Sequence, residues 1–561
     1  MNRNANSHFA VAPANLDIGR SKFDRSHSLV TTFDTGRLIP LYWDEVLPGD
    51  TWKVKTSKVI RMQTLMHPIF SNVYFDTYYF FVPNRLIWRH WKQFMGENTE
   101  SAWIPDVEYS KPQITAPIGG WLNNSLADYL GLPTGVPYLK TDALPFRAYA
   151  KIVNDWFISE ALDDPPVEFD GDADIQGKCV TDENIVQQNL NISYGMAPFV
   201  VTKFKDYFTA ALPSPQRGPS VSIGASTSVQ LPVVTSEDTY NVTGHSALKF
   251  GRLDGSSVSG RHVLNYGVDE SYNGVFVGSS SNSNTGWPVA PNNLYADFTN
   301  TSFGIDVRDM RTAFQLQKYF ERQARSGSRY TEYIKSFFGV DSPDARIQRS
   351  EYLGGNRIPI NINQVIQQSA TTEDSPQGNV AAMSVTVDTH ADFTKSFTEH
   401  GIIMCLGVVR YKHSYQQGVS RMWSRKTKFD YYSPIFANLS EQSIRNKEIV
   451  ALSELNGVNP TNEETFGYQE AWAEYRYHPD MITGEMRSTY GQSLDSWHLA
   501  DDYSALPSLS SSWIREDANT VNRVLAVSNN LSHQFFGDFY FNCDVIRPMP
   551  LYSIPGLIDH H

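Results

Sequence analysis

Apolar and polar residues alternate along several stretches near both ends of the chain. In residues 51–62 (TWKVKTSKVIRM) apolar and polar residues alternate over the first positions. In residues 71–82, an extended backbone would place Val73, Phe75, Thr77, Tyr79 and Phe81 on one face. Near the C-terminus, residues 534–548 repeat this period, and one face carries Phe539, Phe541, Cys543 and Val545. A period of two is typical of strands with one buried face. Further strands are predicted within residues 379–390 and 401–415.

Helical spacing is clearest in residues 306–327, between the two groups of strands. Val307, Met310 and Phe314 recur at this spacing, followed by Gln317 or Phe320, and Gly327 lies beyond the end. The other face of this helix is basic, with Arg308, Arg311, Lys318, Arg322 and Arg325. A second helix is predicted over residues 330–338. Shorter helices are predicted over residues 85–96 after a capping Asn84, 121–131 and 141–161.

Residues 474–488 (EYRYHPDMITGEMRS) crowd ionisable groups into a short stretch. Glu474 and His478 are four apart, which on a helix would place both on one face, as a metal site needs. Pro479 follows His478, however, and its ring disfavours the helical conformation of the preceding residue. The pattern therefore predicts a strand that runs into a turn, and the helical metal site is rejected.

Residues 214–300 differ in character from the rest of the chain. They are rich in Gly and Ser and poor in charge, but apolar residues recur at intervals, which favours short strands and long exposed loops. Because strands lie on both sides of this insertion, they must pair across it, which predicts one mainly β, double-sheet sandwich with helix-containing loops. The expected regions are an extended N-terminal arm (1–30), strands with helical loops (31–213), a surface insertion (214–300), and the basic helix with the remaining strands (301–561).

Composition and charge narrow the function. The chain is 41% hydrophobic, 13% aromatic and 19% charged, with a net charge of −13. A protein that wraps nucleic acid by itself should be basic, so contact with nucleic acid must be local or helped by a basic partner. The scattered Cys179, Cys405 and Cys543 form no CxxC pair, which excludes a cysteine-based zinc site and fits a reducing compartment. The polar N-terminus and the short apolar run at 401–409 favour a soluble protein made in a cytoplasm.

The sequence contains no catalytic signature, and we expect neither an enzyme nor a cofactor. His390, Asp392, Glu399 and His400 are candidate metal ligands, but polar residues at a strand edge explain them more simply. Acidic pairs at 163–164, 463–464 and 501–502 are interpreted as solvated surface. No metal site is therefore predicted.

One cluster, residues 411–432, has a composition that suits either nucleic acid or a subunit interface. Five cations accompany a single acid, Asp430, and aromatic residues lie between them. Alternating cations and aromatic rings suit single-stranded nucleic acid, whose phosphates pair with the cations and whose bases stack. The candidate contacts are Lys412, Arg421, Trp423, Arg425, Lys426, Lys428 and Phe429. The alternative interpretation is that the cluster forms the rim of a subunit interface, because arginine and aromatic residues are enriched there too.

Four sequence blocks resemble the major capsid protein family of the gokushoviruses, within the Microviridae. The blocks are residues 37–54 (RLIPLYWDEVLPGDTWKV), 80–97 (FFVPNRLIWRHWKQFMGE), 474–488 and 535–561. The resemblance extends from about residue 15 to the C-terminus and is weakest over 214–300. It implies that 474–488 is a framework segment rather than a catalytic centre.

The resemblance implies an eight-stranded jelly roll that assembles through pentamers into a T=1 icosahedral shell around circular single-stranded DNA. The insertion would form protrusions at the three-fold axes that meet a host receptor, with candidate contacts Ser279, Asn282, Asn284 and Trp287. Implied partners are an internal scaffolding protein, a pilot protein and a small basic DNA-binding protein, with assembly in a bacterial cytoplasm and the virion as final location. The alternative is a glycan-binding or glycan-cleaving β-sandwich of a phage tail or secreted system.

Overall fold

The computed structural model describes most of the chain. The described residues are 19–97, 108–163, 170–178, 194–219, 221, 233–235, 250–252, 263–268, 273–278, 287–291, 294–296, 307–326, 329–340, 348–369, 371, 377–378, 380–454, 459–527 and 531–552. The chain divides into two compact units, one made of residues 1–217 with 321–561 and the other of residues 218–320.

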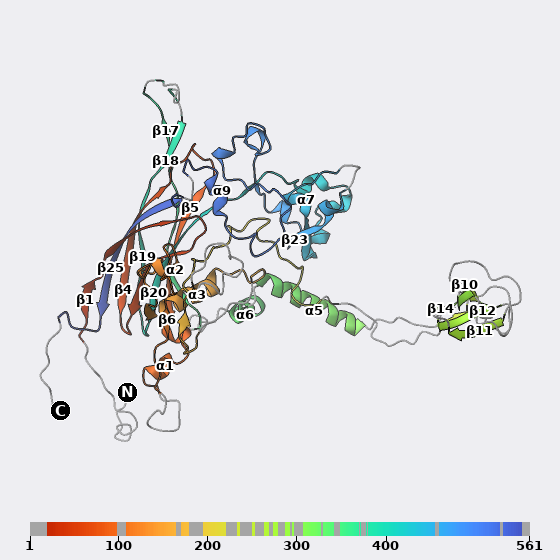
Figure 1. The fold of residues 1–561 in the computed structure, drawn as a ribbon, viewed down its shortest axis with the longest axis horizontal. Helices are drawn as coiled ribbons and strands as arrows, with labels where there is room; N and C mark the ends of the chain where they lie inside the picture. The colour runs from red at the N-terminus through yellow and green to blue at the C-terminus, as the bar shows by residue number, and fades with distance from the viewer. Residues whose placement is uncertain are drawn as a thin grey trace, which may run out of the picture. The chain divides into compact units, whose positions relative to one another are not determined.

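The first sheet of the larger unit joins the two ends of the chain (Figure 1). Its strand order is β1 (Ser21–Asp24), β25 (Phe535–Arg547), β4 (Thr51–Met62) and β19 (Thr386–Ser396), and β2 (His27–Phe33) also pairs with β25. Residues 1–18 lie outside the described part of the chain. Within the predicted arm, residues 21–24 and 27–30 are extended, and they pair with β25 of the same chain.

The second sheet lies against the first. Its order is β15 (Glu351–Gly354), β5 (Val73–Pro83), β20 (Gly401–Tyr411) and β3 (Ile39–Val46), with β16 (Arg357–Pro359) also paired to β5. Side chains of both sheets meet in one core; the rings of Phe75 and Phe539, for example, have centroids 5.8 Å apart. The mainly β sandwich that the sequence predicts is confirmed, with five strands in each sheet.

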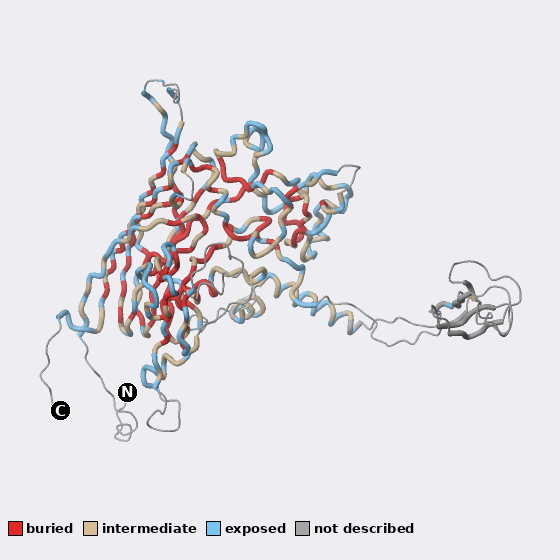
Figure 2. The backbone as a smooth tube through the Cα atoms, in the orientation of Figure 1, coloured by how far each residue is buried: buried red, intermediate tan, exposed pale blue. Residues whose placement is uncertain are grey.

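Strand β20 is buried on both faces, which explains its uninterrupted apolar sequence. Ile403 and Cys405 point into the core between the sheets, whereas Ile402 and Met404 pack in a second core. That second core is covered by α3 (Leu144–Trp156), α2 (Leu126–Tyr129) and the small sheet of β6 (Gln113–Thr115), β7 (Lys140–Asp142) and β8 (Ile175–Gln176). In Figure 2 the buried residues are concentrated in these layers.

The predicted short helices are only partly present. Residues 141–161 contain the 13-residue helix α3, whereas 121–131 contain only the single turn α2. Instead of one helix over residues 85–96, the chain forms the 3-10 turn η2 (Asn84–Leu86) and the single turn α1 (Trp91–Phe94). Asn84 is the first residue of η2 and caps neither turn. Trp88 and Ile87 are drawn into the second core, which interrupts the helix between the two turns.

The C-terminal half adds a loop-rich region beside the sandwich. It contains β21 (Ser414–Tyr415), β22 (Glu441–Arg445), α7 (Asn446–Ile449), α8 (Pro460–Glu463), β23 (Thr465–Glu470), β24 (Asp480–Met481) and α9 (Ala518–Asn522), together with the 3-10 turns η6 (Arg421–Ser424), η7 (Lys428–Asp430), η8 (Pro434–Asn438), η9 (Ala473–Tyr475), η10 (Gly484–Met486) and η11 (Asp495–Trp497). The strand predicted over 474–478 is wrong. Trp472 adopts a left-handed conformation (φ 66°) and turns the chain into η9, so the alternation does not continue.

The remaining described elements follow the insertion or lie within it. The smaller unit contains a sheet of β10 (Phe250–Arg252), β13 (Trp287–Pro291), β12 (Asn273–Gly278) and β11 (Val263–Val268), and a pair of β14 (Leu294–Ala296) and β9 (Val233–Thr235). The two helices predicted after the insertion are confirmed as α5 (Val307–Ser326) and α6 (Tyr330–Phe338). A hairpin of β17 (Ile362–Ile366) and β18 (Val380–Ser384) precedes β19.

Candidate nucleic-acid interface

The basic–aromatic cluster begins where the central strand β20 ends. Residues 414–415 form β21, which pairs in parallel with β24, and the chain then continues through η6 and η7. Asp430 closes η7, because its carboxylate accepts hydrogen bonds from the backbone N–H groups of Lys426 and Thr427. These bonds lower the pKa of Asp430. The single acid of the cluster therefore organises its backbone.

Two arginines of the predicted set hold the cluster to the protein. Arg421 donates a hydrogen bond to the Ser443 carbonyl (2.7 Å) and pairs with Glu448 (3.3 Å). Arg425 pairs with Glu474 (3.5 Å) and lies over the Tyr475 ring, 4.5 Å from its centroid. Their side chains are only 15% and 10% exposed. These arginines therefore anchor the segment, and their charges are already compensated.

The other five candidates are presented to solvent. Lys412, Lys426 and Lys428 are exposed, and they form no ion pair within the described part of the chain. Trp423 is 84% and Phe429 62% exposed. The Lys428 ammonium lies 5.1 Å from the centre of the Phe429 ring. The structure thus separates the seven predicted residues into five exposed side chains and two anchors.

The crowded segment 474–488 packs against this cluster, which the sequence analysis missed. Besides the β21–β24 pairing and the Arg425–Glu474 pair, a cavity of about 80 Å³ lies between them, and its lining includes Tyr415, Arg421, Glu448, Tyr477 and Met481. Burial raises the pKa of Glu448 despite its pairing with Arg421. Gly418 is required nearby, because a Cβ there would collide with the Glu448 carbonyl. Of the ionisable crowd, Glu474 is buried against the cluster, and the other ionisable side chains of the segment are exposed.

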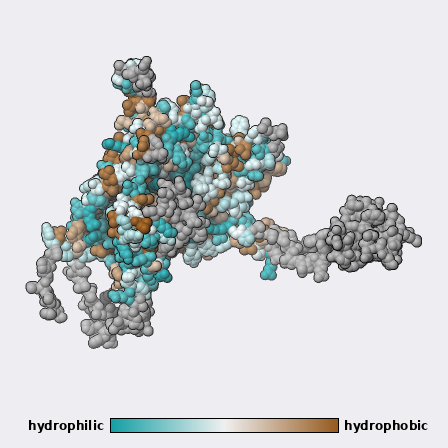
Figure 3. Space-filling view, viewed as in Figure 1, coloured by the Kyte–Doolittle hydropathy of each residue, from teal (hydrophilic) through white to brown (hydrophobic). Residues whose placement is uncertain are grey.

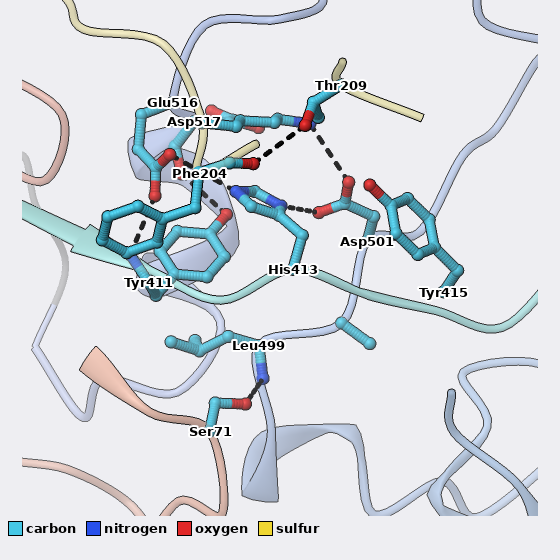
Figure 4. Close-up of polar contacts among 12 residues, drawn as sticks. Ser71, Phe204, Thr209, Tyr411, His413, Tyr415, Leu499, Asp501, Glu516 and Asp517 are labelled. Carbon is cyan, nitrogen blue, oxygen red and sulfur yellow. Dashed lines mark hydrogen bonds and ion pairs between the residues drawn. The ribbon is translucent and has the colours of Figure 1, made fainter. Parts of the chain in front are cut away.

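A buried charge network lies at the start of the cluster (Figure 4). The His413 ring lies between Asp501 (Nδ1 to Oδ1, 2.7 Å) and Glu516 (Nε2 to Oε2, 3.3 Å), and Lys203 also reaches Asp501 (3.1 Å). Burial opposes the charge on His413, but the two carboxylates outweigh it and raise its pKa to about 9. Burial likewise opposes ionisation of Asp501, yet His413 and Lys203 hold its pKa well below its usual range. The network fixes the backbone that leads into the cluster.

Several sequence-based interpretations are corrected by these contacts. Asp501 is buried rather than solvated, and the side chain of Asp163 is only 1% exposed and pairs with Arg515 (2.7 Å). His390 lies 3.2 Å from Asp392. Among the residues that the structure describes, no group of three or more His, Cys, Asp and Glu side chains is placed to hold a metal ion. Within the same residues, no helix is long and apolar enough to span a membrane.

The predicted host-contact residues are largely outside the structural description. Ser279, Asn282 and Asn284 are not among the described residues. Trp287 is the first residue of β13. Cys179 also lies outside the described residues, whereas Cys405 and Cys543 are free thiols in the core.

Comparisons with known proteins agree over nearly the whole chain. Capsid protein VP1 of Chlamydia phage 1 is 40% identical over 578 residues, covering 96% of each chain. Capsid protein VP1 of Spiroplasma virus 4 is 39% identical over 545 residues, again covering 96% of each chain. The corresponding protein of Bdellovibrio phage phiMH2K is 36% identical over 565 residues, covering 98% of this chain and 97% of the relative.

A family model described as "Capsid protein (F protein)" matches residues 13–557. The match spans both sheets, the charge network and the basic–aromatic cluster. Members of this family are structural capsid proteins, so the match confirms the expectation that the chain is not an enzyme. It also argues against the alternative of a glycan-binding or glycan-cleaving β-sandwich. The gokushovirus resemblance is confirmed by the same relatives, and the chain belongs to the phage capsid protein (F protein) family.

Proposed function

We propose that copies of this capsid protein assemble through pentamers into a T=1 icosahedral shell that encloses circular single-stranded DNA. The observation that carries the proposal is the family match over residues 13–557, because it includes the complete sandwich. Large apolar side chains exposed between residues 422 and 439 support it further: Met422, Trp423, Phe429, Tyr431, Tyr432, Ile435 and Leu439. Clustered exposure of this kind marks contact surfaces rather than free surface.

DNA contact is assigned to the five exposed members of the cluster. Lys412, Lys426 and Lys428 supply positive charge, and Trp423 and Phe429 offer faces on which bases stack. Arg421 and Arg425 position the segment instead of meeting phosphate, because each is engaged with a buried glutamate. A subunit-rim role for the same side chains is the competing interpretation.

Further partners belong to this proposal. The net charge of −13 per chain supports a small basic DNA-binding protein in the particle. An internal scaffolding protein and a pilot protein would act during assembly in the bacterial cytoplasm, and the virion would be the final location. The insertion, which includes Ser279, Asn282, Asn284 and Trp287, would form the host-attachment protrusion and bind the cell surface receptor.

Particle mass and imaging test the function directly. We expect the chain, expressed with the other structural proteins of its phage, to sediment as megadalton particles or as pentamers. Electron microscopy of the heaviest fraction should show icosahedral shells with the symmetry of sixty identical subunits, which is what T=1 denotes. A chain that stays at its monomer mass of 63.4 kDa under these conditions would contradict the proposal.

A further inference from the structure

The hairpin of β17 and β18 stands off the sandwich in Figure 1. Its strands pair antiparallel from Ile362 opposite Ser384 to Ile366 opposite Val380. Within the described residues they form a sheet of their own, and an isolated bridge joins Leu65 to Ala382 in the middle of β18. Within the described residues, the outer edge of β17 is therefore open, whereas that of β18 is bridged at Ala382.

The hairpin exposes apolar side chains on both faces. Val365 (42% exposed) and Met383 (51% exposed) lie on one face, and Ile366 (47% exposed) lies on the other. None of the ten residues in the two strands is charged (INQVI and VAAMS). Figure 3 shows hydrophobic residues on the stem of the hairpin, and Figure 2 shows the stem as mostly exposed or intermediate. Because Asn363 and Gln364 are also exposed, the strands present an uncharged and partly apolar surface to water.

Such a hairpin is poorly suited to solvent. An isolated two-stranded hairpin is marginally stable in water, and natural proteins protect open edges with charge, proline or a covering element. The margin of the first sheet uses charge, since Lys22 of β1 pairs with Asp544 of β25 (2.8 Å). The strands of the hairpin carry neither charge nor proline. These features are those of a segment that becomes covered.

We propose that strands β17 and β18 form an assembly arm that docks onto a second copy of this chain along the open edge of β17. The inference rests on the shell proposed above, in which every copy offers the same surfaces to neighbours at fixed positions, so one open edge is covered in every subunit. A basic partner would find carboxylates in the connecting segment, at Glu373 and Asp374, but none on the two strands that carry the exposed apolar side chains. A host-contacting projection would remain in water before attachment, where uncharged open edges promote aggregation.

Substitutions on the hairpin test whether it carries assembly. In Val365→Asp with Met383→Asp, two charges replace apolar groups outside the core, and we expect the particle yield to fall at least about tenfold. The matched control, Val365→Ile with Met383→Leu, keeps both groups apolar and should assemble like the wild type. Thermal melting of unassembled subunits should be the same for all three. Normal particle yield from the aspartate variant would overturn the inference.

Photo-crosslinking identifies the occupant even where a variant folds poorly. Benzoylphenylalanine placed at Val365 should give, in assembled particles, a product with the mass of two chains, and mass spectrometry should locate both ends in this sequence. Dilute unassembled subunits should give no such product. A crosslink to a different protein, or none in particles, would overturn the inference. If the wild-type chain forms no particles at all, the shell proposal itself fails, and sedimentation of the wild-type chain distinguishes this outcome.

Discussion

His413 holds separate parts of the chain together through charge. Its carboxylate partners lie 88 and 103 residues further along the sequence, so no local spacing announces them. For the same reason Asp501, one of an adjacent acidic pair, resembles surface in sequence but is buried in the structure. The cluster of cations and aromatic rings was predictable from composition. The sequence could not show which of these cations form ion pairs, because Glu448 and Glu474 lie far from Arg421 and Arg425 along the chain and approach them only in the folded protein.

The raised pKa of His413 predicts a loss of stability in mild alkali. A group whose pKa rises on folding stabilises the fold fully below its unfolded-state pKa, and that contribution is lost as the pH rises through the folded-state pKa. For His413 these limits are 6.5 and about 9. We therefore expect the free energy of unfolding of unassembled subunits to fall by about 3 kcal/mol across this window, as measured by urea denaturation.

Two variants isolate this effect. His413→Gln should be less stable by about 3–5 kcal/mol at pH 6.5, because two buried carboxylates lose a cation, and its stability should depend less on pH. Exposed His478 provides the matched control, and His478→Gln should retain the wild-type pH dependence. Equal stability of the wild type at pH 6.5 and 9 would contradict the assignment.

The exposed lysines of the cluster give a second prediction at this scale. Replacing Lys412, Lys426 and Lys428 by Ala removes three phosphate contacts, each of which releases about 0.7 of a counterion from a single strand. Particles should therefore release DNA at lower salt, measured by nuclease sensitivity over a salt series. The triple variant of Lys53, Lys55 and Lys140, which are also exposed, has the same charge change and should behave like the wild type. Unchanged DNA retention in the first variant would favour the subunit-rim role.

At the scale of elements, the sequence predicted best where one physical cause dominates. Strands β4 and β25 alternate because one face is buried and the other is open, and the face of β25 that was predicted from its alternation is in the core. Residues 474–478 also alternate, but the left-handed turn at Trp472 and packing against the cluster override the pattern. The helix predicted over 85–96 was lost for a similar reason, because tertiary contacts of Trp88 outweigh local propensity.

The two faces of β25 should differ sharply in their tolerance of substitution. Phe539 is fully buried and contacts Phe75 across the core, so Phe539→Ala should lower the free energy of unfolding by about 3–5 kcal/mol. Its neighbour Tyr540 is 48% exposed on the opposite face, and we expect Tyr540→Ala to cost less than about 1 kcal/mol. Urea denaturation of unassembled subunits measures both values. Similar losses for the two variants would refute the assigned register.

At the scale of the whole molecule, the chain forms two compact units. Residues 218–320 form a compact unit of their own, and the strands before and after it complete the sandwich without it. We therefore expect a chain trimmed within residues 220–298 to form particles that attach poorly to host cells. Sedimentation measures the first property and adsorption assays the second. Failure to form any particle would show that the insertion is structural.

The charge of the assembled shell leads to a final prediction. Three exposed lysines per cluster are few against a chain with a net charge of −13, and repetition by symmetry multiplies both. Stacking on Trp423 or Phe429 adds about 1–3 kcal/mol per base, which orders nucleotides without neutralising a genome. Denaturing gels and mass spectrometry of DNA-filled particles should therefore reveal a small, strongly basic protein. Filled particles made of this chain alone would disprove the charge argument.

The pairing of β4 with β25 also has a consequence for synthesis. Thr51 lies opposite Ile546, so the middle of the first sheet closes only after almost the entire chain has left the ribosome. Until then, the inner faces of β4 and β5 have no C-terminal partner, and a prematurely terminated chain retains them uncovered. Completion of translation thus becomes a condition for a finished subunit. We therefore expect chains that end before β25 to be excluded from particles and to aggregate or be degraded.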